Sequence, residues 1–100
     1  MVKHVILWTL KDEYSIEEKE AIKARVREKL EGLQGKIPGL TQIKVYTSGL
    51  ETSNADMFLD STFVDEAALK TYATFPEHVD IANNYVRPFV ANRSCLDYII

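Results

Sequence analysis

The residues best suited to chemistry lie in one short stretch of the chain, from Phe63 to His78. Tyr72 carries a phenol and His78 an imidazole, and Pro76 should turn the chain between them. An imidazole titrates near neutral pH and can act as a base, whereas a phenol can donate a hydrogen bond without losing its proton. These two residue types, brought together at a corner of the chain, indicate a site for acid–base chemistry.

Two short helices should form that corner. Asp65 is a good N-cap, because its carboxylate can accept hydrogen bonds from the free N–H groups of the first helical turn. Pro76 disfavours helical backbone at the residue before it, so the first helix should end by about Thr74. A proline is also well suited to open a helix, and the second helix should run to about Val86. His78 then lies in its first turn, where the positive end of the helix dipole favours the neutral imidazole.

The rest of the chain has the pattern of strands around one long helix. Ser15 and Glu18 form a capping box, and the helix that they begin should continue to about Leu33, with Gly35 as a left-handed C-cap. Apolar segments predict four strands, over residues 2–10, 41–47, 56–63 and 94–100. This order of elements is typical of an α+β, ferredoxin-like βαββαβ domain with a four-stranded antiparallel sheet. A chain of 100 residues should form a single domain, residues 1–100.

The first strand is largely apolar on both faces. The pleat divides its side chains into one set with His4, Ile6, Trp8 and Leu10 and another with Val5, Leu7 and Thr9. A strand with one face in water would alternate more clearly between apolar and polar residues. We therefore expect helices on one face of the sheet and a second copy of the chain on the other, which predicts a homodimer.

The composition excludes several classes of function. A net charge of −3 without a basic stripe gives no attraction for nucleic acid. No segment predicts a membrane span or a signal peptide. Cys95 is the only cysteine, which excludes an internal disulfide and a multi-cysteine zinc site and fits a cytoplasmic protein. The sequence has no phosphate-binding loop and no metal-ligand spacing, so we expect no metal and no cofactor.

The motifs, taken together, resemble the stress-responsive A/B barrel (Dabb) family. The stretch F-x-D-E-x-A-L-x-x-Y-x-x-x-P-x-H carries this resemblance, with V-K-H-V near the start, I-P-G in the middle and Y-V-R-P-F-V…D-Y near the end. It covers nearly the whole chain, from Val2 to Tyr98. One position departs from the pattern, since many members have His-Pro-x-His where this chain has Phe75. The resemblance implies a dimeric α+β barrel in which two sheets pack face to face.

The resemblance also implies a site. Some relatives are polyketide cyclases of the olivetolic acid type, which close a ring by aldol condensation. By that similarity His78 is the catalytic base, and Tyr72 and His4 assist and orient the substrate. Such a reaction needs a base beside a carbonyl and a donor for the enolate oxygen. We expect a pocket for a small, largely apolar molecule, lined by Ile6, Trp8, Ile22, Val26, Leu30 and Phe75.

A structural interpretation of the same residues leads to a different function. His78 can hydrogen-bond near a helix start, His4 can be a satisfied strand residue, and Tyr72 can be a core aromatic with its hydroxyl at the rim. The protein would then be a noncatalytic, stress-responsive protein with a structural or protective role, and whether it is an enzyme stays open. A cavity on which all three groups converge would favour chemistry, whereas a filled core would favour the structural role.

Overall fold

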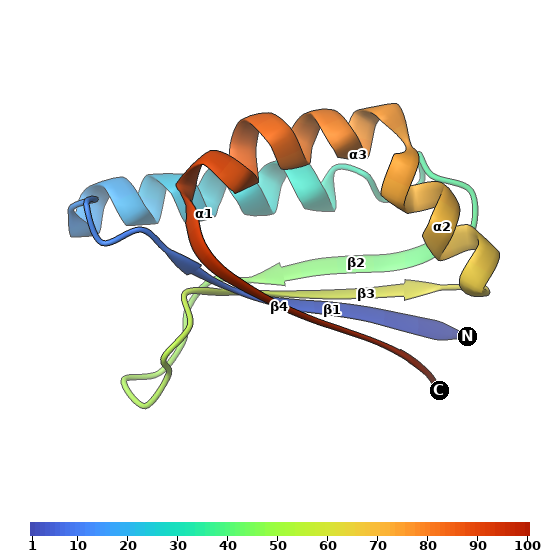
Figure 1. The fold of residues 1–100 in the computed structure, drawn as a ribbon, viewed down its shortest axis with the longest axis horizontal. Helices are drawn as coiled ribbons and strands as arrows, with labels where there is room; N and C mark the ends of the chain where they lie inside the picture. Colours follow the sequence, from blue (N-terminus) through green and yellow to red (C-terminus); the bar gives the residue numbers. More distant parts are fainter.

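The computed structural model describes residues 1–100 and has two layers, an antiparallel sheet and a layer of helices on one of its faces (Figure 1). The elements in chain order are β1 (Val2–Leu10), α1 (Ile16–Glu31), β2 (Leu40–Tyr46), β3 (Met57–Phe63), α2 (Glu66–Thr74), α3 (Pro76–Ile81) and β4 (Val90–Ile99). The four strands lie in the order β2-β3-β1-β4. This arrangement confirms the predicted ferredoxin-like fold.

Strand β1 lies inside the sheet and sets the register of its two neighbours. His4 lies opposite Ser61 of β3 and opposite Asp97 of β4. Ile6 lies opposite Cys95 in the same way. Because paired residues of neighbouring strands point to the same face, Asp97 and Cys95 lie on the helix-covered face with His4.

Helix α1 begins as predicted and ends earlier than predicted. Ser15 accepts a hydrogen bond from the backbone of Glu18, and the Glu18 side chain accepts one from the backbone of Ser15, which completes the capping box. The helix ends at Glu31, and its C-cap is Gly32 in ordinary right-handed backbone. Gly35 has the left-handed φ of +83° but lies in the following turn, so its predicted place at the C-cap was wrong. None of the helices combines the length and the apolar character that a membrane-spanning helix requires.

The corner between α2 and α3 is confirmed. Asp65 caps α2 by accepting a hydrogen bond of 2.8 Å from the backbone N–H of Ala68. Phe75 is extended, with φ −63° and ψ 126°, and Pro76 opens α3. The second helix does not run unbroken to Val86 as predicted, because α3 ends at Ile81 and a wider π-helical turn continues to Val86. Such turns rotate the side chains that follow them, and sequence patterns do not reveal them.

The strand ends agree with the prediction except in β4. Strands β2 and β3 each begin within one residue of the expected position, whereas β4 begins at Val90, four residues before the predicted Ser94. Its segment Val90–Arg93 is not typical of a strand, but it pairs with the far end of β1, where Leu10 lies opposite Val90. Pairing with β1, and not the local sequence, therefore determines the extended conformation of this segment.

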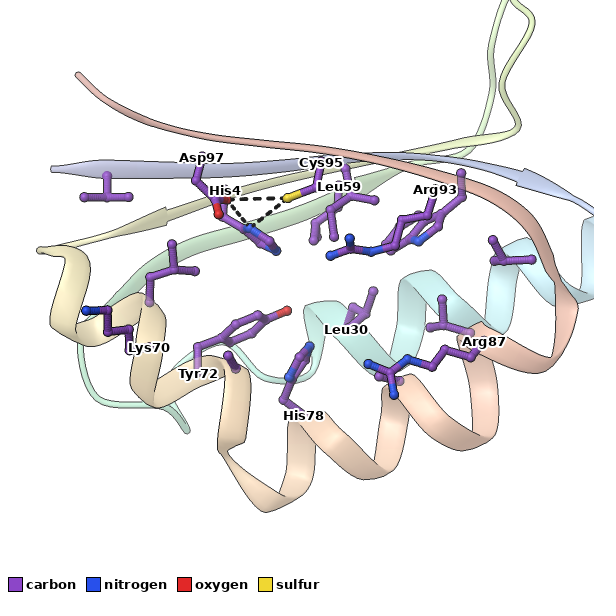
Figure 2. Close-up of a pocket in the computed structure, with 18 of the residues that line it drawn as sticks. His4, Leu30, Leu59, Lys70, Tyr72, His78, Arg87, Arg93, Cys95 and Asp97 are labelled. Carbon is purple, nitrogen blue, oxygen red and sulfur yellow. Dashed lines mark hydrogen bonds and ion pairs between the residues drawn. The ribbon is translucent and has the colours of Figure 1, made fainter.

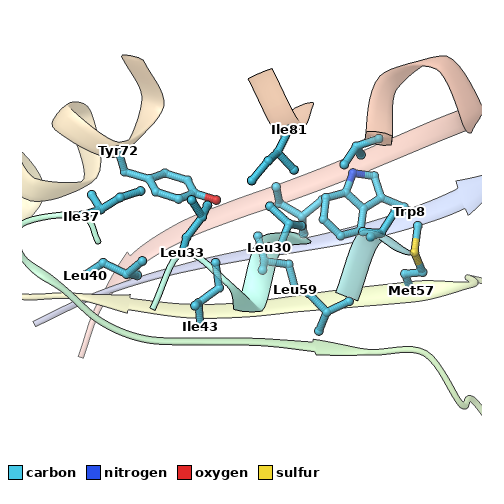
Figure 3. Close-up of a cluster of buried hydrophobic side chains, with 14 of the residues drawn as sticks. Trp8, Leu30, Leu33, Ile37, Leu40, Ile43, Met57, Leu59, Tyr72 and Ile81 are labelled. Atoms are coloured by element: carbon cyan, nitrogen blue, oxygen red, sulfur yellow. The ribbon is translucent and has the colours of Figure 1, made fainter. Parts of the chain in front are cut away.

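The hydrophobic core lies between α1 and the sheet (Figure 3). Val26 and Phe63 are fully enclosed, with no exposed surface. Leu30, Leu33 and the Tyr72 ring are nearly as deeply buried. The sheet residues of this core come from β1, β2 and β3. In β4 every residue after Val90 is exposed, so α1 does not cover this edge strand.

The second face of the sheet carries no helix (Figure 1). Leu7, Tyr46 and Leu96 expose 47%, 53% and 62% of their surface there. The rings of Tyr46 and Phe58 lie 6.2 Å apart and extend this apolar surface across neighbouring strands. Exposed apolar surface of this extent on one face of a sheet is typical of an interaction site.

Candidate functional site

A cavity of about 940 Å³ lies between the sheet and the helical segments that precede β4 (Figure 2). β1 and β4 form one wall, and α2, α3 and the turn after α3 form the other. Of its 22 lining residues, 15 are hydrophobic, so the cavity suits a molecule that is mainly apolar. It lies beside β4, whose residues after Val90 are all exposed, and Leu30 of α1 also contributes to its lining.

Three of the six predicted lining residues face this cavity. Ile6, Trp8 and Leu30 line it. Ile22, Val26 and Phe75 do not, and this part of the expectation is corrected. Val26 points from α1 into the hydrophobic core, where it is fully enclosed. Ile22 and Phe75 are partly buried and pack against the same core.

The three predicted catalytic residues all line the cavity (Figure 2). The rings of Tyr72 and His78 lie 3.9 Å apart between centroids, with an angle of 31° between their planes. The Tyr72 ring also meets His4 edge-on at 5.8 Å. The phenol thus lies between the two imidazoles, one from the sheet and one from the helices.

The Tyr72 hydroxyl is a buried donor without a partner. The residue is 1% exposed, and its oxygen makes no hydrogen bond within the protein. Burial raises the pKa of this phenol above its ordinary value of 10.0, so it keeps its proton. An unpaired buried polar group is costly and therefore uncommon, which makes this hydroxyl available to a ligand in the cavity.

His78 is neutral at physiological pH. Burial is the main cause that lowers the pKa of His78 from 6.5 to about 4. The electrostatic effects of His4 and Arg87 lower it further, and the backbone carbonyls of Ala73 and Tyr72 oppose the fall. The helix dipole predicted a neutral ring, and in the structure the main cause is the loss of water around the ring. Its Nδ1 atom is buried and makes no hydrogen bond of good geometry, although the backbone carbonyls of Ala73 and Tyr72 lie near the ring.

His4 is held from two sides. Its Nδ1 atom lies 2.5 Å from a carboxylate oxygen of Asp97. The Ser61 hydroxyl, fully buried, donates a hydrogen bond of 2.7 Å to the His4 carbonyl and fixes the strand at this point. When the neutral imidazole donates from Nδ1 to the carboxylate, its second nitrogen, Nε2, becomes an acceptor.

The sequence analysis did not identify Asp97 as a site residue. The register of β4 against β1 was the signal that could have found it, because it sets Asp97 opposite His4. Cys95 lies two residues earlier on the same face, and its sulfur is 3.7 Å from His4 Nδ1. Desolvation by burial raises the pKa of the Cys95 thiol, and the charge of Asp97 raises it further, so the thiol stays protonated.

The same three residues are the group in the protein that could ligate a metal ion. One ligand atom each from His4, Cys95 and Asp97 lies within 4.8 Å of the others. Nitrogen, sulfur and oxygen ligands of this kind suit zinc. The imidazole and the carboxylate already bind each other, so their contact is explained without a metal as the positioning of His4.

Two arginines also line the cavity and were not predicted as site residues. Arg87 follows the π-helical turn, and Arg93 belongs to the first half of β4 (Figure 2). Both residues are exposed, and their charges act on the site, since Arg87 lowers the pKa of His78 and Arg93 opposes the rise in the pKa of Tyr72. Their positions depend on the unpredicted turn and on the early start of β4.

Known structures with the same fold include a protein of unknown function, a Dabb family protein and an enzyme. A dimeric protein of unknown function with a ferredoxin-like fold from Bacteroides fragilis is 32% identical, with a TM-score of 0.91 over 99% of this chain and 95% of that chain. A Dabb family protein from Mesorhizobium loti is 21% identical, with a TM-score of 0.76 over 99% and 95%. A hydroxynitrile lyase from Passiflora edulis is 20% identical, with a TM-score of 0.74 over 99% and 92%.

The sequence comparison gives the family. No curated protein is significantly similar to this chain in sequence. The family model described as the Stress responsive A/B Barrel Domain matches residues 2–100. The match covers almost the whole chain and agrees with the fold of its solved relatives. The chain therefore belongs to the stress responsive A/B barrel domain family.

Proposed function

We propose that this protein binds a small, largely apolar carbonyl compound and performs acid–base chemistry on it, of the cyclase or aldol type. One observation carries the proposal: the buried Tyr72 hydroxyl and the buried His78 Nδ1 both lack partners and both belong to residues that line the same apolar cavity. A protein with a purely structural role gains nothing from two unpaired polar groups beside a cavity. The open cavity therefore favours the enzymatic role over the protective one.

In this proposal His78 removes a proton from the carbon next to the substrate carbonyl. The neutral ring can accept a proton, but its low pKa makes it a weak base in the empty site. The negative charge of a developing enolate beside it stabilises the imidazolium, so the transfer becomes favourable only with substrate in place. Tyr72 donates its free hydroxyl hydrogen bond to the enolate oxygen.

His4 is the third group of the proposed site. Asp97 holds one ring nitrogen, which fixes the ring and leaves the other nitrogen for the substrate. We assign His4 the role of orienting the carbonyl compound against Tyr72 and His78. The dimeric state of the Bacteroides fragilis relative and the apolar outer face of the sheet support a homodimer that forms through that face and leaves the cavity free.

Proton abstraction can be tested without knowing the natural substrate. The protein is incubated in D₂O with a panel of alkyl-substituted 1,3-diketones and 3-oxo esters, and NMR follows the exchange of protons next to the carbonyls. We expect the protein to accelerate the exchange of at least one compound and the variant His78→Ala to lose this acceleration. Catalysed exchange that persists in His78→Ala would overturn the assignment of the base, and no catalysed exchange in the panel would contradict the enzymatic proposal.

A further inference from the structure

The cavity contains two arginines that no acidic residue neutralises. Arg87 and Arg93 line it from opposite walls. In Figure 2 the Arg93 side chain reaches into the space between the walls, and the Arg87 side chain runs along the helical wall in the direction of His78. Neither forms an ion pair with a carboxylate anywhere in the protein. Arg87 is held by a side chain one helical turn earlier, since it donates a hydrogen bond of 2.6 Å to the Asn83 amide oxygen. Its guanidinium is therefore positioned before any ligand arrives.

The other charged groups of the cavity are compensated. Lys70 lies 3.7 Å from Glu66, and Asp97 is paired with His4. The two arginines thus give one side of the cavity a positive charge, in a protein whose net charge is −3. A local charge opposite to that of the whole molecule attracts a ligand of the other sign to this place.

We infer that the cavity takes an amphipathic acid, a small apolar molecule with a carboxylate or phosphate group that Arg87 and Arg93 bind. This inference rests on the proposed function, because it names the class of substrate for the same cavity. A guanidinium presents parallel N–H donors that match the two oxygens of a carboxylate or phosphate. Two such groups on facing walls can hold one oxyanion from both sides.

The positions of the other lining residues give the bound acid an orientation. Trp8, Ile6 and Leu30 are buried and apolar, so they suit the hydrocarbon part. The two arginines are exposed and suit the charged end. The charge of Arg87 acts on the His78 ring and that of Arg93 on the Tyr72 hydroxyl, so the oxyanion would lie near the proposed reacting groups. The substrate would then carry its acid group close to the carbonyl.

The single tryptophan makes the inference testable, since Trp8 lines the cavity and its fluorescence reports on binding there. The probes are decanoate, decyl phosphate and decan-1-ol, which share the chain and differ in the head group. The variants are Arg87→Gln, Arg93→Gln and the double substitution, with thermal melting as the check of folding. Arg27→Gln is the matched control, because Arg27 lies on α1, pairs with Glu31 and does not line the cavity.

We expect at least one of the two acids to bind about tenfold tighter than the alcohol or better, as charge-assisted bidentate hydrogen bonds imply. Added salt should reduce this preference. The double variant should bind the acids and the alcohol with the same affinity, whereas Arg27→Gln should keep the preference for the acids. The relative affinities of decanoate and decyl phosphate distinguish carboxylate from phosphate recognition. Equal binding of alcohol and acids to the unaltered protein would overturn the inference and leave the apolar pocket standing. An acid preference that survives the double substitution would overturn it too, and failure of all three probes to bind would contradict both the inference and the proposed pocket.

Discussion

The Tyr72 ring lies against the His78 ring with 3.9 Å between their centroids, and each carries a buried polar atom that nothing in the protein satisfies. Because the two residues lie on either side of the Pro76 corner, the break between α2 and α3 creates this contact. Burial acts on both groups in the direction that keeps them uncharged, since it raises the pKa of Tyr72 and lowers that of His78. The pair is therefore a neutral donor beside a neutral acceptor.

Tyr72→Phe should separate chemistry from stability. The substitution keeps the ring contacts and removes a hydroxyl that has no partner, so the free energy of unfolding should stay the same or rise by about 1 kcal/mol. Catalysed proton exchange should fall by about 100- to 1,000-fold if the hydroxyl stabilises the enolate oxygen. Thermal melting and the exchange assay on the same preparation measure both. A clear loss of stability with unchanged exchange would mean that the hydroxyl has a structural role.

The stability of the protein should depend on pH through His78. Its pKa is about 4 in the folded state and near 6.5 as its ordinary value, so between these values the unfolded chain binds the proton and the folded protein does not. Stability is therefore complete above about pH 6.5 and decreases as the pH falls towards 4. Because the ring is only partly buried, solvent screening should limit this contribution to on the order of 1–2 kcal/mol. Chemical denaturation of the protein and of His78→Gln across this range measures it, and equal pH dependence in the two would refute the assignment.

Asp97→Asn tests how His4 contributes. If His4 orients the substrate, loss of the charged partner should reduce catalysed exchange by about 10- to 100-fold, since hydrogen bonds to charged groups contribute about 1.5–3 kcal/mol. A reduction as complete as that of His78→Ala, together with loss of the acidic limb of the pH–rate profile, would instead make His4 the base. Asp60→Asn is the matched control, because Asp60 binds Lys3 on the opposite face of the sheet at 2.7 Å.

The features that follow from local sequence were predictable. The capping box at Ser15, the Asp65 cap and the break at Pro76 each depend on a few adjacent residues, and the structure contains all three. The alternation of β1 correctly placed His4 and Trp8 on one face. These signals, with the order of elements, were enough for the fold and for placing Tyr72 and His78 at one corner. The place of His4 beside them was implied only by the resemblance to the family.

The features that depend on distant pairing were not predictable. Asp97 meets His4 only because of the register between β4 and β1. Arg87 reaches the cavity after a π-helical turn that has no distinct sequence signal, and Arg93 lies in a segment that becomes a strand only by pairing with β1. Val26 was likewise predicted to line the pocket and instead lies in the core. Sequence periodicity shows which side of a helix is buried, but it does not show whether that side faces the core or a cavity.

The outer face of the sheet should be the dimer interface. Leu7 and Leu96 are exposed in the single chain, so a double substitution to lysine should leave the fold intact and introduce charges into the contact between copies. We expect the dissociation constant to rise by at least about 100-fold, or about 2.8 kcal/mol. Sedimentation equilibrium of the protein, of this variant and of Leu50→Lys, a control in the exposed loop before β3, measures the effect. An unaltered protein that sediments as a monomer at micromolar concentration would contradict the predicted homodimer.

The position of α2, and with it that of Tyr72, should depend on Gly39. This residue has φ +83°, and a Cβ atom added to it would lie 2.4 Å from the Cβ of Ala68 in α2. Its carbonyl also accepts a hydrogen bond of 2.9 Å from the backbone of Val64, just before the helix. Gly35 is the matched control, since it has the same φ and nothing within 4 Å of its added Cβ.

Alanine at the two positions should therefore separate backbone strain from steric conflict. Gly35→Ala should cost about 1–2 kcal/mol of unfolding free energy, the cost of left-handed backbone for a residue with a side chain. Gly39→Ala carries the same cost and adds about 1–3 kcal/mol for the forced shift of α2. Because that shift moves Tyr72 relative to His78, Gly39→Ala should also reduce catalysed proton exchange, which Gly35→Ala should leave unchanged. Denaturation and exchange measured on both variants test this, and equal destabilisation of the two would show that Ala68 and α2 adjust freely, so that Gly39 does not position the site.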